Sequence, residues 1–180
     1  DRAALRNRIV RMANSAETSI RAVKRISSEL RPPILDDLGI CEALEWQAHE
    51  FQARTGIRTR CEFAVVSTRL SRDQMTAVFR IAQEAFTNIL RHARATHVDM
   101  VMRESCAEFE LRIADNGQGI THAQVANPSS LGILGMRERA HLAGGRIEIR
   151  STAGEGTTLA VHIPVAQSEP EAQGDQGSAR

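Results

Sequence analysis

The chain has 180 residues, of which 42% are hydrophobic and 25% are charged, and its 23 basic side chains nearly balance 22 acidic ones. This length and composition indicate a globular protein of one domain with an extension, and a formal net charge of +1 argues against a protein that neutralises many phosphates of a nucleic acid. Lys24 is the only lysine in the sequence and lies in no glycine-rich segment, which argues against a P-loop nucleotide site.

The cysteines indicate neither a disulfide framework nor a zinc site, because Cys41, Cys61 and Cys106 are odd in number and widely spaced. No apolar run approaches the roughly 18 residues of a membrane-spanning helix, and no signal peptide is recognisable. We therefore expect reduced thiols in a cytoplasmic protein. Because the sequence begins with Asp1 rather than Met, we also expect a piece of a longer protein.

Residues 1–31 predict one amphipathic helix, since apolar side chains recur at spacings of three and four from Leu5 to Leu30. The apolar stripe is wide, as suits a helix in a bundle. The segment carries eight basic residues against three acidic ones. A solvated basic face is the favoured interpretation and a nucleic-acid contact the alternative, because no aromatic residue interleaves with the arginines.

Pro32 and Pro33 are predicted to end this helix at Arg31 and to mark a domain boundary, since proline lacks the amide donor. A second helix is predicted over 39–54, with Gly56 as its C-cap, and a strand over 57–66.

A long helix is predicted to begin with a capping box formed by Ser71 and Gln74 and to continue to Ala93. A further helix over 134–143 is expected to end at a pair of glycines, and the polar tail over 166–180 is expected to be disordered. Alternating apolar residues predict strands over 97–104, 108–115, 146–150 and 157–163.

Two polar residues stand at strand ends where the alternation predicts core positions. The strand face that carries Ile113 continues to Asp115, and the face that carries Leu159 leads back to Thr157. Burying a charge without a partner costs several kcal/mol, so Asp115 must be hydrogen-bonded or meet a ligand donor. A role for Asp115 in capping the following turn is the alternative.

The residues after this strand are predicted to form a mobile lid, because they are polar and do not return as a strand. The lid leads into Gly132 and Gly135 at a helix start, where backbone N–H groups can approach a phosphate.

A polar stripe is predicted on the long helix, where Glu84, Asn88 and His92 are spaced four residues apart. A solvated helix face is the alternative interpretation. Asparagine is an indifferent helix former, however, and its side-chain oxygen beside phosphates suits magnesium.

Taken together, these segments resemble the GHKL, or Bergerat-fold, ATPases. QEAFTNILRHARA resembles the N box, DNGQGI the first glycine box, and GILGMRERA with GEGTTL the later glycine boxes. LRPPILDDLGICEAL and GMRERAHLAGGRIEIRSTAGEGTTLAVHIP are similar to sensor histidine kinases of the subfamily that partners response regulators of the NarL type. The resemblance covers about residues 1–165. It implies a two-layer α/β sandwich with a mixed, mainly antiparallel sheet, preceded by one long helix of a dimerisation bundle.

The resemblance also implies a role for each site residue. Asn88 would bind magnesium on the triphosphate of ATP, Glu84 is the acidic residue one turn earlier, and His92 would approach phosphate. Asp115 would accept a hydrogen bond from the adenine amino group, and Thr157 would help to hold the water beside adenine. The nucleotide-binding set is completed by Ile120 and by the glycine-box residues Gly117, Gly119, Gly132, Gly135 and Met136.

The implied function is that of an ATP-dependent protein histidine kinase, which passes the γ-phosphoryl group to a histidine and then to a response-regulator aspartate. None of the six histidines has the setting of the phosphoacceptor. We therefore expect the acceptor on a preceding bundle helix and no autophosphorylation by this chain. Residues 1–31 would be the second bundle helix of a homodimer, 32–165 the catalytic domain and 166–180 a tail. We expect no contact with nucleic acid or directly with the membrane, although the intact sensor could be membrane-anchored.

Two alternatives share this nucleotide site. One is a serine kinase of the anti-sigma-factor type, which the predicted bundle helix and the LDDLG segment disfavour. The other is a non-catalytic ATP-binding module that serves dimer signalling, which the intact Asn88, Asp115 and glycine boxes disfavour.

Overall fold

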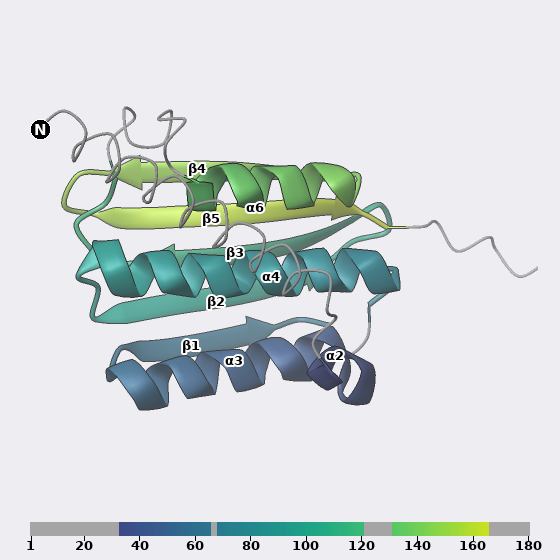
Figure 1. Ribbon diagram of the computed structural model, residues 1–180, viewed down its shortest axis with the longest axis horizontal. Helices are drawn as coiled ribbons and strands as arrows, with labels where there is room; N and C mark the ends of the chain where they lie inside the picture. The colour runs from purple at the N-terminus through teal and green to yellow at the C-terminus, as the bar shows by residue number, and fades with distance from the viewer. Residues whose placement is uncertain (1–32, 66–67, 121–130, 166–180) are drawn as a thin grey trace, which may run out of the picture.

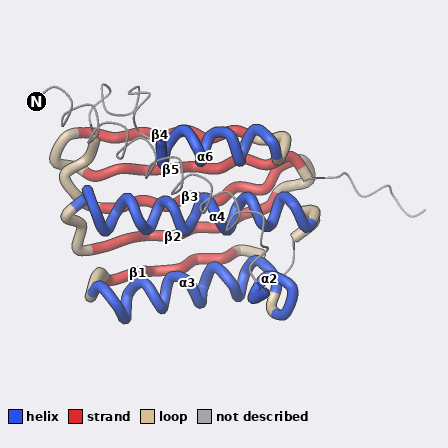
Figure 2. Tube along the Cα trace, viewed as in Figure 1, coloured by secondary structure: helices blue, strands red, loops and turns tan. Residues whose placement is uncertain are grey.

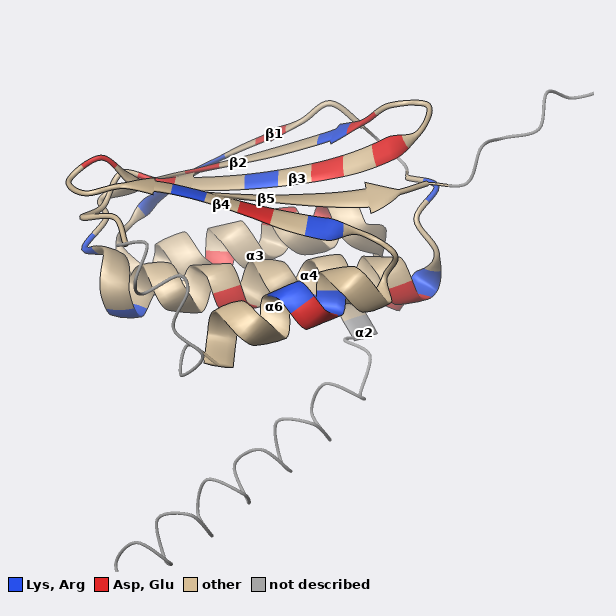
Figure 3. Ribbon diagram, turned by 90° about the horizontal axis from the view of Figure 1, so that it is seen from above, with Lys and Arg blue, Asp and Glu red and all other residues tan. Residues whose placement is uncertain are grey.

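The computed structural model describes residues 33–65, 68–120 and 131–165, which form a five-stranded sheet with helices packed on one face (Figures 1 and 3). The elements in chain order are α2 (Pro33–Asp37), α3 (Gly39–Thr55), β1 (Arg58–Phe63), α4 (Arg72–Asn88), the π-helix η1 (Ile89–Ala93), β2 (His97–Glu104), β3 (Glu108–Asp115), α6 (Leu131–Leu142), β4 (Arg146–Thr152) and β5 (Gly156–Pro164). The expected two-layer sandwich is confirmed. The predictions for 1–31, for the lid over 121–130 and for the tail lie outside the described residues.

The sheet is mixed and mainly antiparallel, as expected. Its strand order is β1-β2-β3-β5-β4, with β1 parallel to β2 and every other pair antiparallel. A parallel pair needs a crossover connection, and α4 with η1 provides it across the helical face (Figure 2). This crossover places α4 over the middle of the sheet.

Local signals set the ends of the two longest helices. Ser71 Oγ accepts the Gln74 N–H at 3.2 Å while Gln74 Oε1 accepts the Ser71 N–H at 2.8 Å, so the predicted capping box begins α4. The predicted C-cap of α3 is also present: Gly56 has φ +73°, and its N–H donates to the Gln52 carbonyl.

The core lies between the two layers. The Phe51 ring of α3 packs against Phe86 of α4 with their centroids 4.6 Å apart. Side chains of β3 and β5 face the helices and are almost completely buried, namely Phe109, Leu111, Ile113, Val161 and Ile163. The alternation predicted for these two strands is therefore confirmed.

The short helix α2 was not predicted, and three of the predicted boundaries described below differ by two or more residues. Pro33 begins the short helix α2, because proline is well tolerated at a first helical position where no amide donor is needed. The strand predicted over 57–66 is shorter, ending at Phe63, whereas the strand predicted over 146–150 continues to Thr152. The helix predicted over 134–143 begins at Leu131, so Gly132, which was expected to precede it, is also helical. Among the described helices, none is both long enough and apolar enough to cross a membrane.

Candidate functional site

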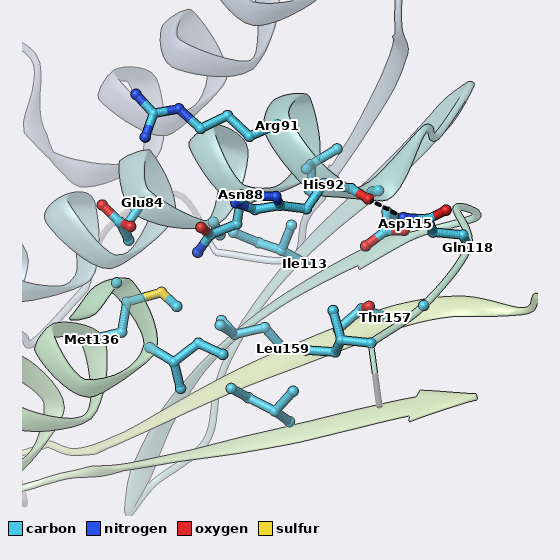
Figure 4. Close-up of a pocket in the computed structure, with 18 of the residues that line it drawn as sticks. Glu84, Asn88, Arg91, His92, Ile113, Asp115, Gln118, Met136, Thr157 and Leu159 are labelled. Atoms are coloured by element: carbon cyan, nitrogen blue, oxygen red, sulfur yellow. Dashed lines mark hydrogen bonds between the residues drawn. The ribbon is translucent and has the colours of Figure 1, made fainter. Parts of the chain in front are cut away.

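A cavity of about 630 Å³ opens between the helices and the ends of the central strands (Figure 4). Most of the site residues expected from the sequence line this cavity: Glu84, Asn88, His92, Asp115, Gly119, Ile120, Gly132, Met136 and Thr157. Gly117 and Gly135 are not among its lining residues. The structure therefore brings together residues that are up to 73 positions apart in the sequence, from Glu84 to Thr157.

Asp115 lies at one end of the cavity, directly opposite Thr157 in the β3–β5 register. Its Oδ1 accepts the Gly117 N–H at 2.8 Å, and the Thr157 N–H also donates to this carboxylate. Burial raises the pKa of Asp115 above its ordinary 3.8, and the two backbone hydrogen bonds offset part of that rise. Asp115 thus caps the turn and also faces the cavity, and a carboxylate has enough lone pairs to accept a further ligand donor.

Ser151 extends this polar group to a third strand, because it is the β4 register partner of Thr157. Its Oγ donates to the Gly156 carbonyl at 2.8 Å, accepts the Ile120 N–H at 2.7 Å and lies 3.1 Å from Thr157 Oγ1. The sequence contains a signal for it, since Ser151 continues the strand face that carries Ile149. Because this strand is predicted only as far as residue 150, Ser151 is absent from the predicted site.

The helical wall of the cavity changes type at the predicted site. The regular α-helix ends at Asn88, and residues 89–93 form the π-helix η1, which contains His92. Single π-turns occur frequently at functional sites. Arg91 and Arg94 also line the cavity and were missed, although both flank His92 in the RHAR sequence. They add positive charge at the end of the cavity formed by η1.

Two hydrogen bonds join the turn after Asp115 to the end of η1. The Gln118 N–H donates to the Ala93 carbonyl and its Nε2 donates to the His92 carbonyl, each at 2.7 Å. A Cβ on Gly117 would come within 2.2 Å of the Ala93 oxygen. Gly119 has φ +73°, and a Cβ there would come within 2.3 Å of a β4 carbonyl oxygen. These two glycines therefore allow close packing of backbone on backbone.

The start of α6 closes against α4 beside the predicted metal ligand. A Cβ on Gly132 would lie 2.2 Å from Glu84 Oε1 and 3.6 Å from Asn88 Nδ2. Gly135 instead faces the end of the Arg139 side chain, at 3.1 Å. Gly132 is thus the glycine that allows α6 to approach the Glu84 carboxylate.

Asn88 and Glu84 present oxygen ligands one helical turn apart at the cavity. Within the described ranges there is no cluster of three or more His, Cys, Asp and Glu residues suited to hold a metal ion. This donor set fits a magnesium ion that keeps most of its ligands as water and phosphate oxygens, because Mg²⁺ commonly binds through only one or two protein side chains.

Residues 73–167 match the family model of the histidine kinase-, DNA gyrase B- and HSP90-like ATPases. The chain belongs to this family, and the cavity lies in its ATP-binding domain.

Similar curated proteins are sensor kinases by name. The chain is 33% identical over 153 residues to the signal transduction histidine-protein kinase/phosphatase DegS of Brevibacillus brevis, and 34% identical over 155 residues to the sensor histidine kinase MctS of Rhizobium johnstonii. It is 34% identical over 158 residues to the sensor histidine kinase LiaS of Bacillus subtilis. These alignments cover 84–88% of this chain but only 33–42% of each relative. The similarity to these kinases confirms the prediction that the chain is the ATP-binding portion of a histidine kinase.

Solved structures share the fold. The histidine kinase domain of the Erythrobacter litoralis EL346 blue-light activated kinase matches with a TM-score of 0.59 at 20% identity, covering 68% of this chain and 59% of that one. The mycobacterial sensor histidine kinase MprB matches with a TM-score of 0.54 at 16% identity, covering 71% of this chain and 95% of that one.

Proposed function

We propose that this chain binds Mg-ATP and catalyses transfer of the γ-phosphoryl group to a histidine of a dimerisation bundle, from which a response-regulator aspartate takes it. The observation that carries the proposal is the placement of Asp115 and Asn88 in one cavity, with hydrogen-bond acceptors for a base near Asp115 and an oxygen ligand for a metal at Asn88. The names of the relatives support the same reaction.

The sheet side of the cavity suits a purine base. Ile113, Ile149 and Leu159 provide an apolar surface next to the polar pair Asp115 and Thr157. An apolar surface with a few convergent polar groups is the usual composition of a small-molecule site. The Asp115 carboxylate accepts a hydrogen bond from the amino group of adenine, and the apolar side chains exclude water from the ring.

The helical side suits a triphosphate. Arg91, His92 and Arg94 line the η1 part of this side, and the two arginines add positive charge there. Phosphoryl transfer requires positioning and charge stabilisation more than covalent chemistry from the protein. Magnesium, when bound, neutralises phosphate oxygens as charge develops on them. Asn88 would hold it, and the Glu84 carboxylate can accept a hydrogen bond from the attacking imidazole and orient that ring.

The assignment to one subfamily of histidine kinases rests on sequence resemblance. The LRPPILDDLGICEAL segment supports the subfamily whose partners are response regulators of the NarL type. Such a kinase acts as a homodimer in the cytoplasm, and in each protomer the first of the two bundle helices carries the acceptor histidine. Residues 1–31 are the second of these helices in this proposal, 32–165 the catalytic domain and 166–180 a tail.

The deciding experiment mixes this chain with a separately produced histidine-kinase dimerisation bundle that carries the acceptor histidine, and follows label from γ-labelled ATP. We expect label on the acceptor histidine, none on this chain alone, and none with a bundle whose acceptor is replaced by alanine. Label that survives acid as a phosphoserine would support the serine-kinase alternative. Tight ATP binding without transfer to any bundle would support the non-catalytic module.

A further inference from the structure

We propose that Ser151 determines base specificity, by holding the Thr157 hydroxyl so that this end of the cavity accepts amino groups and rejects oxo groups. Ser151 is a positioning residue here, acting through Thr157. The inference rests on the proposed nucleotide binding and deepens it, because it identifies the group that selects the nucleotide.

The direction of the Ser151 proton follows from its partners. A serine hydroxyl has one proton to donate and two lone pairs that accept. The Gly156 carbonyl can only accept, and it lies 2.8 Å from Ser151 Oγ, so the proton points there. The Ile120 amide can only donate, and it occupies one lone pair at 2.7 Å. One lone pair of Ser151 remains for a further donor.

Thr157 supplies that donor. Its Oγ1 lies 3.1 Å from Ser151 Oγ, whose single proton is already committed to Gly156. The Thr157 hydroxyl must therefore donate to Ser151. Its proton points along the sheet toward β4, and its own lone pairs are left for a ligand in the cavity that it lines.

The consequence is a row of hydrogen-bond acceptors at the end of the cavity where the base is proposed to bind. Thr157 stands between Ser151 on β4 and Asp115 on β3 in the strand register. With the Thr157 proton held by Ser151, both Thr157 and the Asp115 carboxylate present only lone pairs. Adenine carries an amino donor at its sixth ring position, where guanine and hypoxanthine carry an oxo acceptor. At the sixth ring position the row therefore favours the amino group of adenine over an oxo group, directly or through a water that donates to both residues.

Without Ser151 the selection weakens. The Thr157 hydroxyl of a Ser151→Ala variant can rotate and donate its proton into the cavity, where an oxo group accepts it. A site that is built from hydrogen-bonding groups discriminates against a ligand of the wrong polarity because its buried groups are left unpaired. When the hydrogen bond from Thr157 to Ser151 is lost, part of that penalty for an oxo base is removed.

The test compares ATP with ITP, which differ at this ring position by the amino and oxo groups, by calorimetry on the wild type, Ser151→Ala and Ser151→Thr. We expect the ratio of ITP to ATP dissociation constants to fall about tenfold in Ser151→Ala, the effect of one hydrogen bond. Ser151→Thr keeps the hydroxyl and should keep the wild-type ratio. Thr157→Val should lower the ratio as well, with no further decrease in the double variant Ser151→Ala/Thr157→Val. If Ser151→Ala does not fold, Ser151→Cys provides the test, because its thiol fills the same space but is only a weak hydrogen-bond acceptor, and the ratio should again fall.

Equal weakening of ATP and ITP in Ser151→Ala would overturn the inference, because a merely structural contact to Ile120 affects both nucleotides alike. A wild type that binds ITP as tightly as ATP would also overturn it while leaving the proposed function intact. A wild type that binds neither nucleotide would overturn both proposals.

Discussion

The Cα of Gly117 faces the carbonyl oxygen of Ala93 so closely that a Cβ would come within 2.2 Å of that oxygen. The contact joins the turn after Asp115 to the end of the π-helix, and it involves backbone on both sides. Neither partner can move away as the end of a flexible side chain would. The position of Asp115 in the cavity thus depends on a glycine two residues later.

Gly117→Ala is therefore expected to lower the free energy of unfolding by about 1–3 kcal/mol, the usual cost of overpacking. Gly135→Ala is the matched control, because its new Cβ would meet only the end of the Arg139 side chain, and alanine favours the helix. Urea denaturation of both variants measures the difference. Equal stability of the two variants would contradict the role of the Ala93 contact.

Asp115→Asn is expected to weaken ATP binding at least tenfold, because a hydrogen bond to a charged group contributes about 1.5–3 kcal/mol. The melting temperature should not fall at neutral pH, since burial disfavours the charged carboxylate in the ligand-free protein. Asp99→Asn makes the same change at a position outside the cavity, where the side chain accepts from His97, and should leave the affinity unchanged. Calorimetry that finds wild-type ATP affinity in Asp115→Asn would refute the assignment.

The raised pKa of Asp115 predicts a pH dependence of stability. The folded protein keeps this proton at pH values where the unfolded chain, with an ordinary pKa of 3.8, has lost it. The stabilisation is complete below 3.8 and is lost as pH rises through the folded-state pKa. The free energy of unfolding of the wild type, relative to Asp115→Asn, should thus increase as pH falls from about 7 toward 4. A difference that does not vary with pH would exclude a raised pKa.

Asn88→Ala should remove the enhancement of ATP binding by magnesium, because the carboxamide oxygen is the protein ligand proposed for the ion. Asn88→Asp keeps an oxygen at this position and should retain the enhancement. Calorimetric titrations with ATP, in magnesium and in a chelator, measure both variants. Full magnesium enhancement in Asn88→Ala would place the ion elsewhere.

Gly132→Ala should leave stability unchanged or increase it by up to about 1 kcal/mol, since alanine is the better helix former. Its Cβ would displace the Glu84 carboxylate, which is the end of a flexible side chain. We expect slower phosphoryl transfer with nearly unchanged ATP affinity. The transfer assay and calorimetric ATP titration of the same variant separate the two effects, and an unchanged transfer rate would argue against a role for Glu84.

Asp115 and Thr157 could be found from the sequence because strand alternation is strictly local. A polar residue at a core position stands out once the strand is recognised. The Ser71–Gln74 capping box is local in the same way, since both partners lie within one helical turn. Such signals depend on a few neighbouring residues, and the structure confirms them.

Other features depend on contacts between distant segments. The π-helix interrupts a sequence with good α-helical periodicity, at the place where Gln118 hydrogen-bonds two of its carbonyls. Pairing with β5 extends β4 beyond residue 150, so that Ser151 reaches Thr157. Helix α6 includes its two glycines because one of them packs on Glu84. Local propensity contains no information about these partners.

The strand order also has a consequence for self-association. Within the described residues, the sheet ends at β1 and β4, and unpaired strand edges are the usual templates for aggregation. Both strands place charged side chains at alternate positions, with Arg58, Arg60 and Glu62 on β1 and Arg146, Glu148 and Arg150 on β4. A strand that is added to either edge would have to bring charges of the opposite sign in register. The charged edges of the sheet thus disfavour the nonspecific strand pairing that leads to aggregation.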